Sequence, residues 1–123
     1  MTMANRMMGS GIAAGAAQNI QGDVSSALTA SGTTKANALA LSSAINYITI
    51  CSSGKAVSLP ALALGDDVEI YNNGANSLLV FTQVGSTDSI TNLTANAGYT
   101  LSVQKGAHFR KCTSTIVMVN KSS

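Results

Sequence analysis

The stretch DDVEIYNNGANSLLVF, residues 66–81, is the part of the sequence that decides the expected fold. Its first half places Val68 and Ile70 between polar neighbours, which is the pattern of a strand with one buried face. The Asn-Gly pair in the middle tolerates positive φ and is typical of a turn. The second half, residues 78–81, is apolar at every position. The stretch therefore predicts a hairpin whose second strand needs cover on both faces.

From residue 24 onward, short runs rich in Val, Ile, Leu, Thr and Tyr are separated by Gly or Asn about every ten residues. This spacing predicts one all-β domain over residues 24–123, a jelly-roll-like sandwich or barrel. Strands are expected at residues 26–30, 36–41, 47–51, 56–59, 67–72, 78–82, 89–91, 100–104, 107–111 and 115–120. The segment 33–50 also fits a short helix, because its Ala and Leu spacing matches either period.

The run TSTIVMVN, residues 113–120, is also apolar on both faces. A two-layer sandwich covers only one face of each sheet, so two such strands call for a third layer. An identical subunit would supply that layer. The subunit interface is then expected at Leu79, Phe81, Val117 and Val119, with Leu78 and Val80 replacing the first two if the other face points outward. The alternative is cover by the N-terminal arm or by a long loop of the same chain.

Charged residues make up only 10% of the chain, against about 25% in an ordinary soluble domain. A surface with few charges is often covered, which favours an assembly. The alternative is a small soluble domain rich in Ala, Ser and Thr. The formal charge of +2 and the scattered basic residues do not favour nucleic acid as a partner. No run approaches the roughly 18 apolar residues that a membrane span needs, so no membrane partner is expected.

Residues 1–23 contain Met, Ala, Gly, Ser and Asn without a sustained apolar period. Such a segment cannot bury enough surface to fold alone, so we expect an extended N-terminal arm. Ordering in a groove of a partner is one interpretation, because methionine adapts to irregular surfaces. The expected anchors of the arm are Met3, Arg6, Met7, Met8 and Ile12. The alternative is a terminus with no binding role.

The sequence gives little basis for catalysis, and no enzyme, cofactor or metal site is expected. His108 is the single histidine, and no G-x-S-x-G turn is present. Cys51 and Cys112 lack the spacing of a zinc site, and we expect reduced, buried thiols, with a disulfide between them as the alternative. The acidic cluster at residues 66–69 is interpreted as solvated turn residues, because a calcium loop needs more ligands.

The string from Ser58 to Phe109 resembles a recurring segment of tailed-phage structural proteins. The shared pattern is L-P-A at residues 59–61, V-x-x-Y-N-x-G-A-N-x-L-x-V at residues 68–80, and I-x-x-L-x-x-N-A at residues 90–97. With its lead-in, the resemblance covers roughly residues 23–111 and leaves the arm outside. The ending TIVMVNKSS departs from the aromatic ending of those proteins.

The resemblance implies a capsid decoration (cement) protein on the outer surface of the virion. Such a protein would form a homotrimer, bind the major capsid protein lattice and stabilise the head, and residues 1–23 would contact the capsid. The alternative is a head-fibre or tail-fibre knob that binds a receptor or glycan. Tyr47, Tyr71 or Tyr99 would then offer stacking surfaces.

Overall fold

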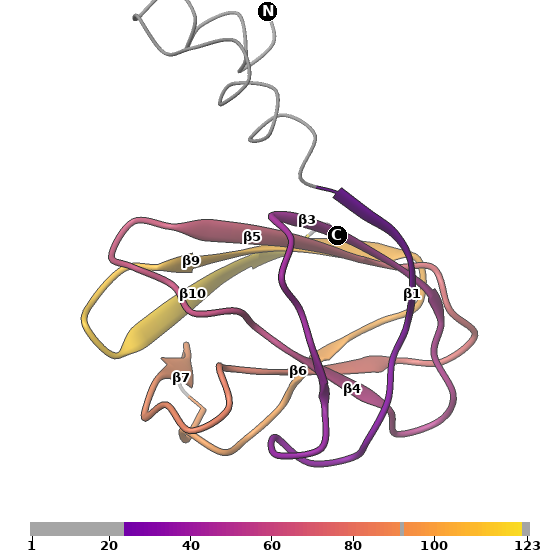
Figure 1. Ribbon diagram of the computed structural model, residues 1–123, viewed down its shortest axis with the longest axis horizontal. Coiled ribbons are helices and arrows are strands. Elements are labelled where there is room, and N and C mark those ends of the chain that lie inside the picture. The colour runs from indigo at the N-terminus through magenta and orange to yellow at the C-terminus, as the bar shows by residue number, and fades with distance from the viewer. Residues whose placement is uncertain (1–23, 92, 122–123) are drawn as a thin grey trace, which may run out of the picture.

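The computed structural model describes residues 24–91 and 93–121. The predicted arm and its anchors, Met3, Arg6, Met7, Met8 and Ile12, lie outside the described residues. Every regular element within the described ranges is a β-strand (Figure 1), which confirms the all-β prediction. The helix considered for residues 33–50 is wrong, because this segment forms turns and two strands.

Ten strands follow one another closely along the described chain. They are β1 (Val24–Thr29), β2 (Leu39–Ala40), β3 (Ile45–Ile50), β4 (Ala56–Ser58), β5 (Asp67–Asn72), β6 (Leu78–Phe81), β7 (Ser89–Ile90), β8 (Tyr99–Leu101), β9 (Lys105–Lys111) and β10 (Ile116–Lys121). Each expected strand overlaps one of them, since period-two patterning and Gly or Asn breaks mark strand positions well.

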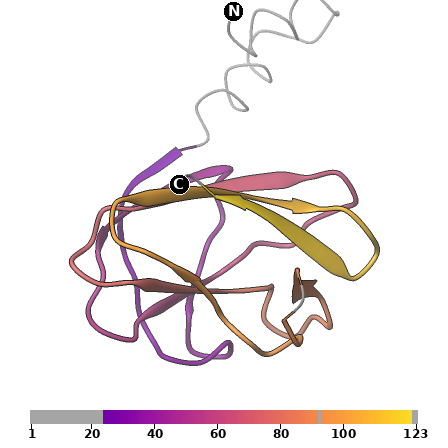
Figure 2. The same cartoon turned by 180° about the vertical axis from the view of Figure 1, so that it is seen from behind.

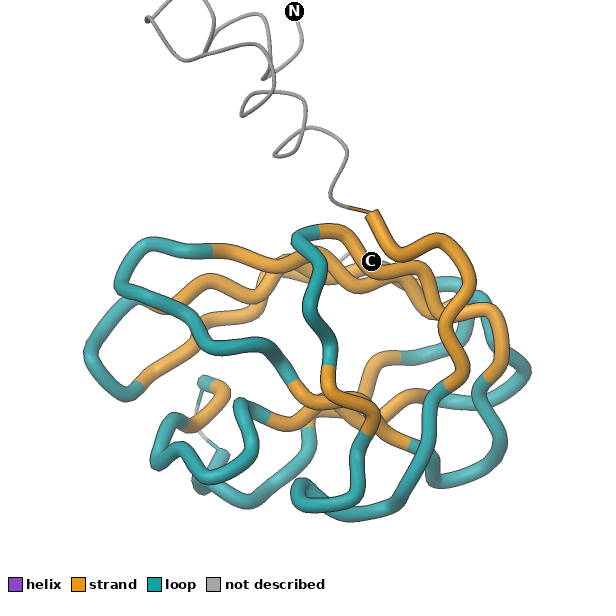
Figure 3. The backbone as a smooth tube through the Cα atoms, viewed as in Figure 1, coloured by secondary structure: helices purple, strands orange, loops and turns teal. Residues whose placement is uncertain are grey.

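The chain alternates between two sheets that form two layers (Figures 1 and 3). Sheet A has the strand order β1-β3-β5-β9-β10-β7, and sheet B has the order β2-β4-β6-β8. The strands β1, β3 and β5 are parallel neighbours, and so are β2, β4 and β6. Each pass through both sheets therefore lies beside the previous pass, in a solenoid-like winding. The strands β8, β9 and β10 then add antiparallel pairs.

This strand order corrects two finer predictions. A jelly roll is built from antiparallel Greek keys, whereas the first half of each sheet here is parallel. The predicted hairpin at residues 66–81 is instead a corner, because β5 belongs to sheet A and β6 to sheet B. Turn residues show that the chain changes direction, but they do not show whether it returns in the same sheet.

The buried amide of Asn72, the partly buried amide of Asn76 and a close backbone contact hold the corner at residues 72–76. The side-chain nitrogen of Asn72 donates to the carbonyls of Asn76 (2.9 Å) and Leu101 (3.1 Å), and its oxygen accepts from the Gly74 N–H (3.0 Å). The Asn76 amide donates to the carbonyl of Cys51 (3.0 Å) in the previous pass. The corner is therefore tied both to the neighbouring pass and to β8 across the sandwich.

Apolar side chains from both sheets fill the space between the layers. The fully buried ones include Ile48, Ile70, Leu78, Val80, Ile90, Leu101 and Phe109. The rings of Tyr99 and Phe109 meet edge to face, with their centroids 5.8 Å apart. Burial of one side chain of this size stabilises the fold by about 1.5–3 kcal/mol.

The chain's own loops cover much of the second apolar face of β6. A Cβ on Gly98 would lie 3.1 Å from the Phe81 ring and 3.3 Å from Leu79, so the segment before β8 packs directly over both. Phe81 is only 5% exposed, while Leu79 is partly buried. A loop of the same chain therefore covers Phe81, which is the alternative to cover by a second subunit.

The predicted subunit-interface residues of β10 also lie against the chain's own core. Val117 is 1% exposed and belongs to the core, and Val119 packs against it. Phe81 and Val117 thus have almost no surface left to offer a second subunit. The opposite face of β10 carries Met118, which is 47% exposed.

Gly74→Ala tests the packing of the corner. A Cβ at this position would lie 2.6 Å from the Cβ and backbone nitrogen of Cys51, and a backbone neighbour cannot move cheaply. We expect the free energy of unfolding, measured by urea denaturation, to fall by about 1–3 kcal/mol, as for overpacked cores. Asn73→Ala changes an exposed side chain in the same corner and is the matched control. Equal effects of the two substitutions would contradict the packing described here.

Candidate functional site

Polar, charged and aromatic side chains from β3, β5, β9 and β10 converge on the outer side of sheet A. Figure 2 shows this sheet as the upper layer, with its outer side turned away from sheet B. We call this surface the open face. The strand register places on it Ile45, Tyr47, Asp67, Glu69, Tyr71, His108, Arg110, Met118 and Asn120. Adjacent positions on these strands, such as Ile70 and Phe109, point into the core.

Acidic side chains of β5 meet His108 and Arg110 of β9 on the open face. His108 Nε2 lies 2.8 Å from Glu69 Oε1, and Arg110 Nη2 lies 3.1 Å from Asp67 Oδ2. These side chains are partly or largely exposed, so each pair contributes only about 0–1 kcal/mol to stability. The strand register brings these groups together within one chain.

Two tyrosines lie side by side on the open face. Tyr47 and Tyr71 are direct register partners on β3 and β5, and they are 39% and 38% exposed. Gly106 is the next partner in the row, and a Cβ there would clash with the Cδ1 side of the Tyr71 ring. Because Gly106 has no side chain, the Tyr71 ring has room to lie over it on the sheet. Tyr99, by contrast, packs against Phe109 and does not join them.

The Tyr71 hydroxyl is oriented by its neighbour on the same strand. It donates to Glu69 Oε2 at 3.3 Å. Partial burial, followed by the charge and the hydrogen bond of Glu69, raises the pKa of Tyr71 above its ordinary value. The hydroxyl therefore remains a hydrogen-bond donor at neutral pH.

The tyrosine pair borders a depression of about 390 Å³, which we call the tyrosine depression. Asn73, Gln104 and Lys105 line it together with the two rings. Gln104 has a positive φ of 61°, which is uncommon for a residue with a side chain, and its N–H donates to the Asn72 carbonyl at 2.7 Å. The loop on this side is thus fixed by the same segment that forms the corner.

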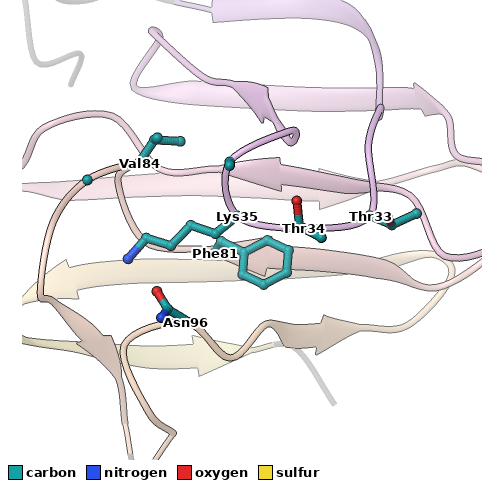
Figure 4. A pocket seen from close by; sticks show the side chains of 8 residues that line it. Thr33, Thr34, Lys35, Phe81, Val84 and Asn96 are labelled. Carbon is teal, nitrogen blue, oxygen red and sulfur yellow. The ribbon is translucent and has the colours of Figure 1, made fainter.

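A second depression, of about 480 Å³, lies over the outer side of sheet B. Figure 4 shows Phe81, Val84, Asn96 and the threonines at positions 33 and 34 around it. Lys35 extends beside Phe81 in the same view. Because Phe81 itself is almost fully buried, the side chain closes the core more than it offers a binding surface.

Lys35 fastens the loop that covers this side of sheet B. Its ammonium group donates to the carbonyls of Ser86 and Ala95, each at 2.9 Å. Burial lowers the pKa of Lys35, and the nearby carboxylate of Asp88 opposes part of that change. Asp88 also forms an ion pair with Lys111 at 3.1 Å. Lys35 therefore serves as a structural clamp between three loops.

Both cysteines are free thiols, as the sequence predicted. Cys51 is buried at the corner, donates to the Ser77 carbonyl at 3.5 Å, and has its pKa raised by burial. Cys112 is exposed, so the prediction of burial is wrong at this position. Cys112 follows the last residue of β9, where the chain leaves the sheet.

Among the described residues there is neither a cluster of metal ligands nor a membrane-spanning helix. No group of His, Cys, Asp and Glu residues among them is arranged to hold a metal ion. Within the same ranges, no helix is long and apolar enough to span a membrane. Comparisons with protein-family models, with curated proteins and with solved structures find no match for this chain.

Sequence reasoning named some of the site residues and missed others. Tyr47 and Tyr71 were expected as stacking residues, and the fold brings them together. Lys35 was missed, although a lone lysine within the uncharged run SGTTKANALAL is a weak signal for a buried, partnered amine. Gly106 falls between the expected strands 100–104 and 107–111, yet it lies within β9 beneath Tyr71.

Lys35→Met tests the clamp. The substitution keeps the apolar stem but removes the donor of the Ser86 carbonyl, and it leaves the Ala95 carbonyl with only the longer bond from the Thr82 hydroxyl at 3.4 Å. We expect the free energy of unfolding at pH 7 to fall by about 1–3 kcal/mol, the usual result when buried acceptors lose a partner. Lys121→Met removes an exposed amine and serves as the control. If both variants unfold at the same denaturant concentration, Lys35 does not stabilise these loops.

Glu69→Gln tests the coupling of Glu69 to Tyr71. Removal of the negative charge makes ionisation of the phenol easier, so Tyr71 should titrate at a lower pH than in the native chain. Ultraviolet titration of tyrosinate measures this, and Tyr71→Phe identifies the transition that belongs to Tyr71. Asp67→Asn, two positions away on β5, should produce a smaller shift. An unchanged Tyr71 transition in Glu69→Gln would show that the two side chains do not interact.

Proposed function

We propose that this chain is a non-catalytic virion protein of a tailed phage. In this proposal it decorates the outer surface of the capsid as a cement protein. It forms a homotrimer and binds the major capsid protein lattice. The observation that carries the proposal is the open face. It extends over several strands of sheet A, presents their outward-pointing side chains, and is bordered by shallow depressions. A surface of this kind suits a macromolecular partner better than a small substrate, which is usually held in a concave pocket.

The residues that carry the phage resemblance have structural roles in this chain. Val68, Leu78, Val80 and Ile90 are buried in the core. Asn72, Gly74 and Asn76 form the corner between the sheets. The resemblance therefore supports a shared fold more directly than a shared docking site. In this proposal, the docking residues lie on the open face.

For the fold itself, we infer a short solenoid-like sandwich in place of the jelly-roll-like sandwich that the sequence suggested. Its parallel half consists of β1 to β6, and its antiparallel half consists of β8 to β10. The hydrogen bonds of the corner and the parallel register support this inference.

The proposed mechanism is multivalent binding. A trimer presents three open faces and three arms, so contacts that are weak singly reinforce one another through effective concentration. Binding to the assembled lattice then stabilises the head by mass action. In the proposed trimer, the partly exposed Leu79 contacts a neighbouring subunit. Met118 replaces Val117 as the contact residue of β10, because Val117 is buried and Met118 is exposed.

A fibre knob that binds a receptor or glycan is the second candidate function. The tyrosine depression favours it, because two adjacent exposed aromatic rings with amide neighbours can bind a ligand that stacks. The number of copies separates the two candidates: cement is abundant on heads, whereas a fibre knob is present in few copies.

Mass measurement of the purified full chain, alone and on isolated heads, tests the main proposal. We expect a trimer in solution and a copy number on heads close to that of the capsid protein. Met118→Asp should shift the purified chain towards monomer, because a carboxylate in a packed interface is costly. Leu64→Asp adds the same carboxylate at an exposed loop position and is the control. A native monomer, or a few copies located on the tail, would refute the cement function.

A further inference from the structure

We propose that the tyrosine depression is a binding site for neutral carbohydrate. This inference goes beyond decoration of the capsid and gives the second candidate function a specific site. It involves Tyr47, Tyr71, Asn73 and Gln104, which come from β3, from β5 and its following corner, and from the loop before β9.

The two rings provide the apolar part of the site. Tyr47 and Tyr71 are register partners on adjacent parallel strands, which lie about 4.8 Å apart. Both tyrosines are more than one third exposed, although exposed aromatic surface is costly in water. A sugar ring has a face of C–H groups that can cover such surface, and its hydroxyl groups lie around the edge.

One ring is already held in place before a ligand arrives. The Tyr71 ring lies over Gly106, where only a glycine leaves room, and its hydroxyl is bonded to Glu69. A binding residue that is fixed in advance loses little conformational freedom on binding, which favours affinity.

The edge of the depression supplies hydrogen-bonding groups that suit hydroxyls. Asn73 and Gln104 carry amides, each with two donor hydrogens and an acceptor oxygen. Gln104 is held in the left-handed region at the end of the loop, with its N–H bonded to Asn72. Unfavourable backbone geometry of this kind concentrates at functional sites. Neutral amides can pair with hydroxyls in either direction.

The charges around the site favour a neutral ligand over nucleic acid. A single-stranded nucleic acid also stacks on aromatic rings, but it needs a basic groove for its phosphates. Lys105 lines the depression, Glu69 lies beside Tyr71, and Asp67, two positions earlier on the strand, pairs with Arg110. These balanced charges do not form a basic groove, and a carboxylate oxygen can accept a hydrogen bond from a sugar hydroxyl.

The test uses the native full chain and NMR titration with neutral oligosaccharides built from glucose, galactose, mannose or N-acetylglucosamine. We expect at least one of these four probes to bind with a Kd of about 1 mM or tighter, with the largest shifts at residues 47, 71, 73 and 104. Tyr47→Ala should weaken binding at least tenfold. Gly106→Ala keeps both tyrosines but displaces the Tyr71 ring, and it should also weaken binding.

Leu64→Ala is the control: it shortens an exposed apolar side chain outside the depression, and it should leave sugar affinity unchanged. Urea denaturation of each variant shows that it is folded. The proposal is overturned if none of the four probes binds, if binding survives Tyr47→Ala, or if oligodeoxythymidine binds in their place. It is also overturned if Tyr47→Ala breaks an oligomer, because the tyrosines then contact a second copy. Loss of sugar binding in Tyr47→Ala with unchanged attachment to heads would separate this site from the cement function.

Discussion

The buried side-chain amide of Asn72 is the interaction on which the rest of the structure depends. It satisfies carbonyls from its own corner and from the end of β8, and its oxygen receives the N–H of Gly74. Without a partner, each of these buried polar groups would cost about 1–3 kcal/mol. The amide therefore makes a sharp passage from sheet A to sheet B stable. Because Asn76 also reaches the previous pass at Cys51, the corner sets the parallel stacking of the two passes.

The two sheets end up with different outer surfaces. Over sheet B, the loops held by Lys35 and the segment at Gly98 cover Phe81. Over sheet A, the tyrosines, the β5–β9 charge pairs and Met118 remain open to solvent. This asymmetry leaves sheet A with the more open outer surface.

The positions of the strands could be predicted from the sequence, but their partners could not. Alternation in residues 67–72 and the apolar run in residues 78–81 give two strands, whereas the choice between a hairpin and a corner depends on the inward-pointing amide of Asn72. Leu79 and Phe81 lie in a strand that is apolar on both faces, which indicated that another part of the assembly covers it. The sequence pattern could not identify the covering loops, because they lie far along the chain. The candidate site shows the same limit: Tyr47 and Tyr71 stand out as aromatic residues, while their pairing depends on the register of β3 and β5.

Native-state hydrogen exchange at the corner tests the central role of Asn72 most directly. The N–H of Gly74 is bonded to the Asn72 side chain, and the N–H of Asn73 is bonded to the Ile48 carbonyl. If the corner holds the two sheets together, both amides should exchange only through global unfolding, with the same opening free energy as amides in the middle of β5. Exchange at the rate of a freely fraying loop, while β5 stays protected, would contradict this account.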